Sequence, residues 1–95
     1  MKIGYCAIDL KVLHSQSLKN KRSVIKRIIA RITRKFNASV AEVADQNLWQ
    51  RATLGVALVG NNAVLLEKQL RAIAASIEDG FGVEIIAIDS EVVAV

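Results

Sequence analysis

The chain has 95 residues with a net charge of +4; 53% of them are hydrophobic and none is proline. This length is typical of one domain, and the apolar content excludes an extended disordered chain. No apolar run approaches the roughly 18 residues of a membrane span, and the first residues lack a signal-peptide layout. The lone cysteine, Cys6, has no partner for an internal disulfide, which is typical of a reducing compartment. We therefore expect a cytoplasmic protein with a single domain, residues 1–95, and no membrane contact.

The first third of the chain contains a strand followed by a helix. Residues 2–13 alternate, with Cys6, Ile8, Leu10 and Val12 on one face, which indicates a strand. Ser17, or alternatively Ser15, is a candidate N-cap for the helix that follows. Its 3.6-residue period ends near Phe36, and Asn37 is a candidate C-terminal cap. The expected apolar stripe consists of Leu18, Ile25, Ile28, Ile29, Ile32 and Phe36.

The rest of the chain continues the alternation. We expect strands at residues 38–44, 52–60 and 83–95, a connection at 45–51, and a helix at 63–80. The strand at 52–60 is apolar on both faces, which favours a place inside the sheet. Asn61 and Asn62 offer a turn and an N-cap, and Gly80 and Gly82 end the helix. The expected apolar stripe of this helix consists of Leu65, Leu66, Leu70, Ile73, Ala74 and Ile77.

The element order βαββαβ predicts an α+β fold, a ferredoxin-like sandwich. Such a fold has a four-stranded antiparallel sheet with both helices on one face. The uncovered face then presents small and apolar side chains, which predicts a homodimer or larger homo-oligomer; a solvent-facing sheet is the alternative. The expected interface consists of Tyr5, Ala7, Gly55, Ala57, Val59 and Ala87, with Trp49 from the connection.

Trp49 is the only tryptophan and lies on the expected connection. It is interpreted either as a lid packed over the end of the core or as an interface or base-stacking residue. We favour packing or a dimer contact.

Basic residues are concentrated in the first helix. Residues 10–41 hold nine Lys or Arg and no acid, whereas the remainder holds four Lys or Arg and nine acids. On a helical wheel, all basic side chains of the helix face away from the apolar stripe except Lys21, which falls within it. Like charges four residues apart, such as Arg27 and Arg31, cost a few tenths of a kcal/mol, so an ordinary solvated face mixes signs.

An all-positive face about 28 Å long predicts contact with a phosphate backbone. The expected nucleic-acid-binding residues are Lys19, Arg22, Lys26, Arg27, Arg31, Arg34 and Lys35, with Arg51 as an addition. No aromatic side chain lies on this face, so recognition would depend on charge and shape rather than base sequence. Two alternatives remain: a protein-interaction module that docks an acidic partner, and a face that only confers solubility.

No residue pattern points to catalysis. His14 has no other ligand at metal spacing, and Cys6 has no activating neighbour. Asp9 and Asp89 could approach each other if the first and last strands pair, but no pocket is evident. With no P-loop or GxSxG motif, we expect a non-catalytic protein without a metal, cofactor or small-molecule substrate.

Three motifs resemble the YlxP-like family of small bacterial proteins of unknown function. They are SLKxKR at 17–22, KFNxSVAEV at 35–43 and WQRAxLGVA at 49–57, in matching order and spacing. The resemblance implies a ferredoxin-like fold. Because family members are often encoded beside translation-initiation and ribosome-maturation genes, it also implies RNA or ribosome association. Many relatives have Glu at the position of Asn20, where it would complete a capping box with Ser17, and Asp at the position of Asn47.

Overall fold

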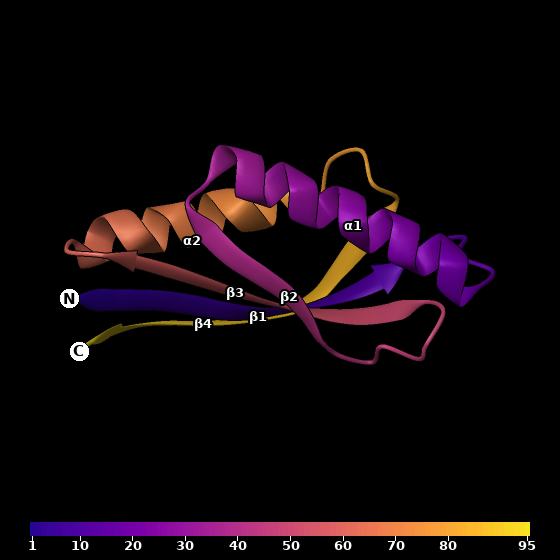
Figure 1. Cartoon of the computed structure of the whole chain (residues 1–95), viewed down its shortest axis with the longest axis horizontal. Coiled ribbons are helices and arrows are strands. Elements are labelled where there is room, and N and C mark those ends of the chain that lie inside the picture. The colour runs from indigo at the N-terminus through magenta and orange to yellow at the C-terminus, as the bar shows by residue number, and fades with distance from the viewer.

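A computed structural model describes residues 1–95, and it contains six elements in the order βαββαβ. They are β1 (Lys2–Val12), α1 (Leu18–Lys35), β2 (Ala38–Ala44), β3 (Arg51–Gly60), α2 (Ala63–Ile77) and β4 (Val83–Ala94). The strands form one antiparallel sheet in the order β2-β3-β1-β4, and both helices lie on the same face of it (Figure 1). The expected ferredoxin-like sandwich is confirmed.

Helix α1 begins at the expected cap. The Oγ of Ser17 accepts a hydrogen bond from the backbone N of Asn20 at 3.0 Å. Ser15, the alternative cap, is instead buried and donates its hydroxyl to the carbonyl of Ser17. Asn20 also reaches back: its Oδ1 accepts from the backbone N of Gln16 at 3.3 Å. Asn20 therefore does not make the reciprocal bond of a capping box to the N–H of Ser17, and binds the N–H of the preceding residue instead.

Three element ends differ from the expectation. Asn37 does not cap α1, because the backbone is already extended at Phe36 (φ −129°) and enters β2 two residues later. Strand β1 stops before Leu13, whose N–H donates to the carbonyl of Gly82 rather than to a strand partner. Helix α2 ends at Ile77, before the glycines, and Gly80 and Gly82 reverse the chain at positive φ.

The core lies between the sheet and the two helices. Helix α1 packs mainly against β2, and α2 packs against β1 and β4. The helices bury Ile25, Ile28, Ile32, Leu66, Leu70, Ile73 and Ile77 against alternate side chains of β1 and β3. Leu65, expected in the α2 stripe, is 51% exposed because it lies about 100° around the helix from Leu66. Neither helix combines the length and the apolar composition needed to cross a bilayer.

Candidate nucleic-acid interface

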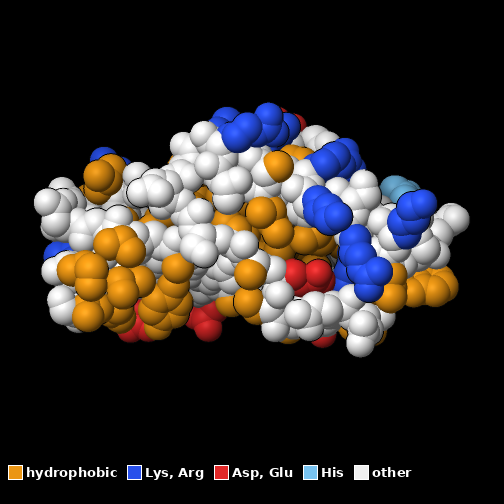
Figure 2. Space-filling model, viewed as in Figure 1, with side chains coloured by type: hydrophobic (Ala, Val, Ile, Leu, Met, Phe, Trp, Pro, Cys, Tyr) orange, Lys and Arg blue, Asp and Glu red, His pale blue; other side chains and the backbone are white.

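Helix α1 presents most of its basic side chains to solvent. Lys19, Arg22, Lys26, Arg27, Arg34 and Lys35 are all exposed, while the opposite face of the helix forms part of the core. Figure 2 shows Lys and Arg side chains following α1 across the upper part of the molecule. The structure therefore brings six of the expected phosphate-binding residues onto one surface, which we call the α1 basic face.

The charges of the α1 basic face are not neutralised within the chain. The only ion pair in the structure joins Lys21 to Glu42, so none of the six exposed side chains is paired with a carboxylate. The first turn of α1 contains no acid, and Lys19 there is opposed by the positive end of the helix dipole. Arg34 and Lys35 lie in the last turn, where the dipole favours them.

Arg31 differs from its neighbours because it is partly buried and already bound. Its Nη1 donates to the carbonyl of Asp79 at 3.1 Å, and its guanidinium lies 4.4 Å from the centroid of the Phe81 ring. These contacts attach α1 to the turn between α2 and β4 through a hydrogen bond and a cation–π interaction. Arg31 therefore has a structural role at the border of the basic face.

Arg51 is not brought together with the α1 basic face. The alternate residues Ala52, Leu54 and Val56 of β3 are buried under the helices, so the exposed Arg51 side chain projects from the other face of the sheet. Its cross-strand neighbour there is Lys11. Only the backbone of Arg51 approaches α1.

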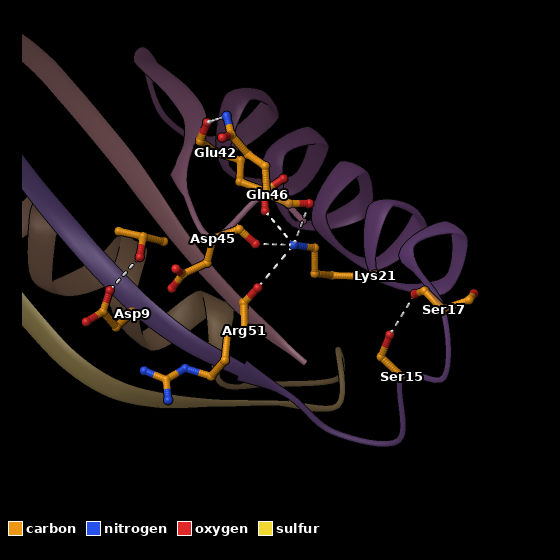
Figure 3. Close-up of polar contacts among 9 residues, drawn as sticks. Asp9, Ser15, Ser17, Lys21, Glu42, Asp45, Gln46 and Arg51 are labelled. Atoms are coloured by element: carbon orange, nitrogen blue, oxygen red, sulfur yellow. Dashed lines mark hydrogen bonds and ion pairs between the residues drawn. The ribbon is translucent and has the colours of Figure 1, made fainter. Parts of the chain in front are cut away.

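Lys21 is fully buried and binds four oxygen atoms (Figure 3). Its Nζ donates to the carbonyls of Asp45 at 2.7 Å and of Gln46 and Arg51 at 3.1 Å each. The fourth contact is an ion pair of 3.0 Å with Oε2 of Glu42, which has no other polar partner. Burying an unpaired ammonium costs several kcal/mol, and this set of oxygens compensates for it. Sequence reasoning missed this role, although the place of Lys21 within the apolar stripe was the available signal.

Further hydrogen bonds join the two connections at this end of the sheet. The Nε2 of Gln50 donates to the carbonyl of Ser15 at 3.0 Å, and the backbone N of Val12 donates to the carbonyl of Gln50 at 2.9 Å. Together with Lys21, they attach the β2–β3 connection to the start of α1 and to the end of β1.

The family follows from a sequence comparison. The family model described as a protein of unknown function (DUF503) matches residues 3–90. The chain belongs to the DUF503 family. It is also 40% identical, over 76 residues, to the uncharacterized protein YlxP of Bacillus subtilis (strain 168), which covers 80% of this chain and 83% of that protein. The resemblance carried by the three motifs is thus confirmed.

The three motifs meet in space in this DUF503 chain. Residues 17–22 supply Lys21, residues 35–43 supply Glu42, and residues 49–57 supply Gln50 and Arg51. These positions build a structural cluster around one buried ammonium. In this chain, residues of the three motifs therefore hold this end of the fold together.

Solved structures confirm the fold of the DUF503 chain. A de novo designed protein with a ferredoxin fold, LFR1 1, superposes with a TM-score of 0.62 at 13% identity, covering 97% of this chain and 85% of the design. The designed protein Foldit4 gives a TM-score of 0.55 at 12% identity and 99% and 98% coverage. A hydantoinase/carbamoylase family amidase from Burkholderia ambifaria gives 0.54 at 15% identity, covering 95% of this chain and 27% of the amidase. At these identities the likeness concerns the fold alone.

The open face of the sheet carries the residues expected at an oligomer interface. Tyr5, Ala7, Ala57, Val59 and Ala87 are exposed there and Gly55 is half-buried. Tyr5 lies opposite Ala57, and Ala7 opposite Gly55, so these residues form a contiguous patch on the central strands. Val43, which was not among the expected interface residues, is 55% exposed. Its side chain covers Gly55 so closely that a Cβ added to this glycine would lie 3.0 Å from Cγ1 of Val43.

The open face is more polar at its β4 side than the sequence indicated. The hydroxyl of Tyr5 donates to Glu91 at 2.5 Å, and this hydrogen bond and the carboxylate charge raise the pKa of Tyr5. Asp9 accepts from the hydroxyl of Thr53 at 2.6 Å and lies opposite Ala87. Asp9 and Asp89 occupy separate positions and share no hydrogen bond, so the structure does not join them as a pair of carboxylates.

Trp49 does not pack over the core. It is 56% exposed, and the neighbouring Leu48 is 49% exposed. The interpretation of Trp49 as a lid is therefore wrong: the connection is held from its two ends, which leaves these two side chains in solvent.

A groove of about 260 Å³ lies between α2 and β4. Cys6, Leu70, Ala74 and Ile88 contribute its apolar lining, and Arg71 is among its polar residues. Burial raises the pKa of the Cys6 thiol, which keeps it protonated and a poor nucleophile. No group of His, Cys, Asp or Glu side chains could hold a metal ion.

Proposed function

We propose that this DUF503 protein is a non-catalytic cytoplasmic protein that binds RNA, free or within the ribosome, through the α1 basic face. The observation that carries the proposal is the six exposed basic side chains without a carboxylate partner. The family's gene neighbourhood, as the resemblance implies it, favours RNA over other polyanions. The residues that bind phosphate are Lys19, Arg22, Lys26, Arg27, Arg34 and Lys35, with Arg31 at the border and Arg51 outside the surface.

The α1 basic face suits a phosphate backbone in length and in charge. The 18 residues of α1 extend over about 27 Å. Like-charge neighbours at four-residue spacing, such as Arg22 and Lys26, each cost a few tenths of a kcal/mol in the free protein. Phosphates relieve this repulsion, and the release of their counterions supplies binding free energy without base specificity.

The test measures binding of a fluorescein-labelled single-stranded RNA by anisotropy over a series of salt concentrations. About five phosphate contacts predict a slope near −3.5 in a plot of log K against log salt. The double variant Lys26→Glu with Arg27→Glu removes two contacts and adds repulsion, so we expect binding at least about tenfold weaker. This pair avoids Arg31, whose replacement would also disturb the turn at Asp79.

The matched control is Lys68→Glu with Arg71→Glu on α2, two exposed positions that change the net charge equally. Binding by the control is expected to stay close to that of the parent. Binding that ignores salt, or that both double variants weaken alike, would contradict the proposal.

A second candidate function is a homo-oligomeric protein-interaction module that docks an acidic partner. The exposed patch around Tyr5, Ala57 and Val59 favours it as a contact between two copies. The α1 basic face would then receive carboxylates instead of phosphates. A complex that resists nuclease but is lost in the α1 double variant would favour this candidate over RNA.

A further inference from the structure

The β2–β3 connection is held by hydrogen bonds on both sides of Trp49. Asp45 adopts a left-handed backbone (φ 61°), and its carbonyl accepts from Lys21 Nζ and from the backbone N of Leu48. On the other side of Trp49, Gln50 is bound through its side chain and its carbonyl. These bonds fix the path of the backbone on both sides of the tryptophan in the folded protein.

The same connection leaves the indole ring in solvent. The hydrogen bonds around Lys21 do not by themselves explain why a tryptophan is exposed here. Trp49 is 56% exposed, and the carbonyls on both sides of it lie within 3.1 Å of the ammonium of a residue in α1. Figure 1 shows the β2–β3 connection and the start of α1 at the same end of the molecule. Trp49 is thus presented where the α1 basic face begins.

Basic side chains reach this end from both faces of the sheet. Lys19 and Arg22 lie in the first turns of α1, and Arg51, two residues after Trp49, projects from the open face beside Lys11. Against them the connection carries one acid, Asp45. An exposed aromatic ring at the same end of a molecule as unpaired cations suits single-stranded nucleic acids, since bases stack on the ring while cations hold the phosphates.

We propose that Trp49 is a base-stacking residue, and that the RNA bound by this protein is single-stranded where it leaves the α1 basic face. The inference rests on the proposed function and adds the class of RNA. In a duplex the bases are stacked on one another and offer no free face to an indole ring. Because the backbone around Trp49 is already ordered, little conformational entropy is lost when a base stacks on it.

The experiment uses the intrinsic fluorescence of Trp49, the only tryptophan of the chain. The parent protein is titrated with an oligouridylate and with a duplex RNA of equal length at low salt. We expect the oligouridylate to quench the fluorescence and the duplex to leave it nearly unchanged. Trp49→Ala is expected to weaken oligouridylate binding by about 5- to 150-fold, the range for loss of one stacked base. Trp49→Phe retains an aromatic ring and recovers most of the affinity.

Leu48→Ala is the matched control, since Leu48 is the adjacent side chain and similarly exposed. Its affinity for both RNAs, and the affinity of Trp49→Ala for the duplex, are expected to match the parent. Circular dichroism checks that each variant is folded. If RNA binds with the expected salt slope but Trp49→Ala binds it normally and no quenching occurs, the inference is wrong while the proposed function stands.

Two other outcomes also overturn the inference. If neither RNA binds, the proposed function fails together with it. If Trp49→Ala changes the oligomeric state and leaves oligouridylate affinity unaltered, Trp49 is a contact between protein copies.

Discussion

Lys21 is the one charged side chain that the fold removes from water completely. Its ammonium has three N–H donors, and four oxygens from three separate parts of the chain surround it. The long side chain therefore acts as a cross-link between α1, β2 and the start of β3. A neutral side chain of similar size would fill the space but would leave Glu42 without a partner and would remove a donor from three carbonyls, of which that of Asp45 keeps its bond from the N–H of Leu48.

We predict that Lys21→Met lowers the free energy of unfolding by about 3–5 kcal/mol, because it leaves the buried Oε2 of Glu42 without its partner. Urea denaturation measures the change. Lys26→Met, an exposed change of the same kind in the same helix, is expected to shift stability by no more than about 0.5 kcal/mol. Adding Glu42→Leu to Lys21→Met is expected to restore part of the loss. A Lys21→Met protein about as stable as Lys26→Met would show that the cluster contributes little.

At the scale of the element, α1 combines an apolar face that stabilises the fold with a basic face whose charges repel one another. Its apolar stripe packs on the sheet, whereas its outer face accepts like-charge neighbours that a stable isolated helix would avoid. The rest of the chain does not relieve this repulsion, since no exposed basic side chain of α1 is in an ion pair. Packing of α1 on the sheet thus stabilises the helix in spite of the repulsion between its basic side chains.

The double variant Lys26→Glu with Arg27→Glu should therefore fold more stably than the parent. It creates oppositely charged neighbours with Arg22 and Arg31, each worth about 0.2–0.5 kcal/mol at low ionic strength. Urea denaturation at low salt measures the gain, which is expected to shrink in 1 M salt as the charges are screened. The α2 control, Lys68→Glu with Arg71→Glu, replaces the oppositely charged residues Glu67 and Arg71, four positions apart, with two acids and is expected to show no gain. A loss of more than about 1 kcal/mol in the α1 variant would mean that these residues have a structural role.

At the scale of the whole molecule, the two helices cover one face of the sheet and leave the other uncovered (Figure 1). On that face Val59 is 63% exposed and Tyr5 is 42% exposed, beside three alanines. The acids Asp89 and Glu91 lie on β4, and Lys11 and Arg51 lie on the two central strands. The open face therefore combines an apolar centre with charges of both signs around it, an arrangement that suits a contact between two copies.

We predict that the protein is a dimer in solution through this face and that Val59→Glu shifts it to the monomer, because the new carboxylate would be buried in the contact. Sedimentation equilibrium over a range of protein concentrations measures the change. Val64→Glu on α2 is the control, since Val64 is 60% exposed but lies on the helical side. A parent protein that remains monomeric at high concentration, or a dimer that both variants weaken equally, would contradict this prediction.

The order of elements and the apolar stripes were predictable because they depend on local periodicity. Alternation in β1 and the 3.6-residue repeat in α1 are properties of neighbouring residues, and the caps Ser17 and Asn62 act over three positions. Six of the α1 basic residues were placed correctly on the exposed surface for the same reason. Local periodicity did not predict that Leu65 is exposed or that α2 ends at Ile77. Burial at the edge of a helix depends on which side chains of other elements pack there.

The partners of individual side chains were decided by the tertiary structure. Lys21 binds carbonyls that lie 24, 25 and 30 residues further along the chain, and Arg31 binds one that lies 48 residues away. Trp49 is exposed because those same bonds hold its backbone, and Arg51 points away from α1 because of the register of β3. Such contacts join segments that are distant in sequence, and no local pattern contains the geometry with which the sheet brings them together.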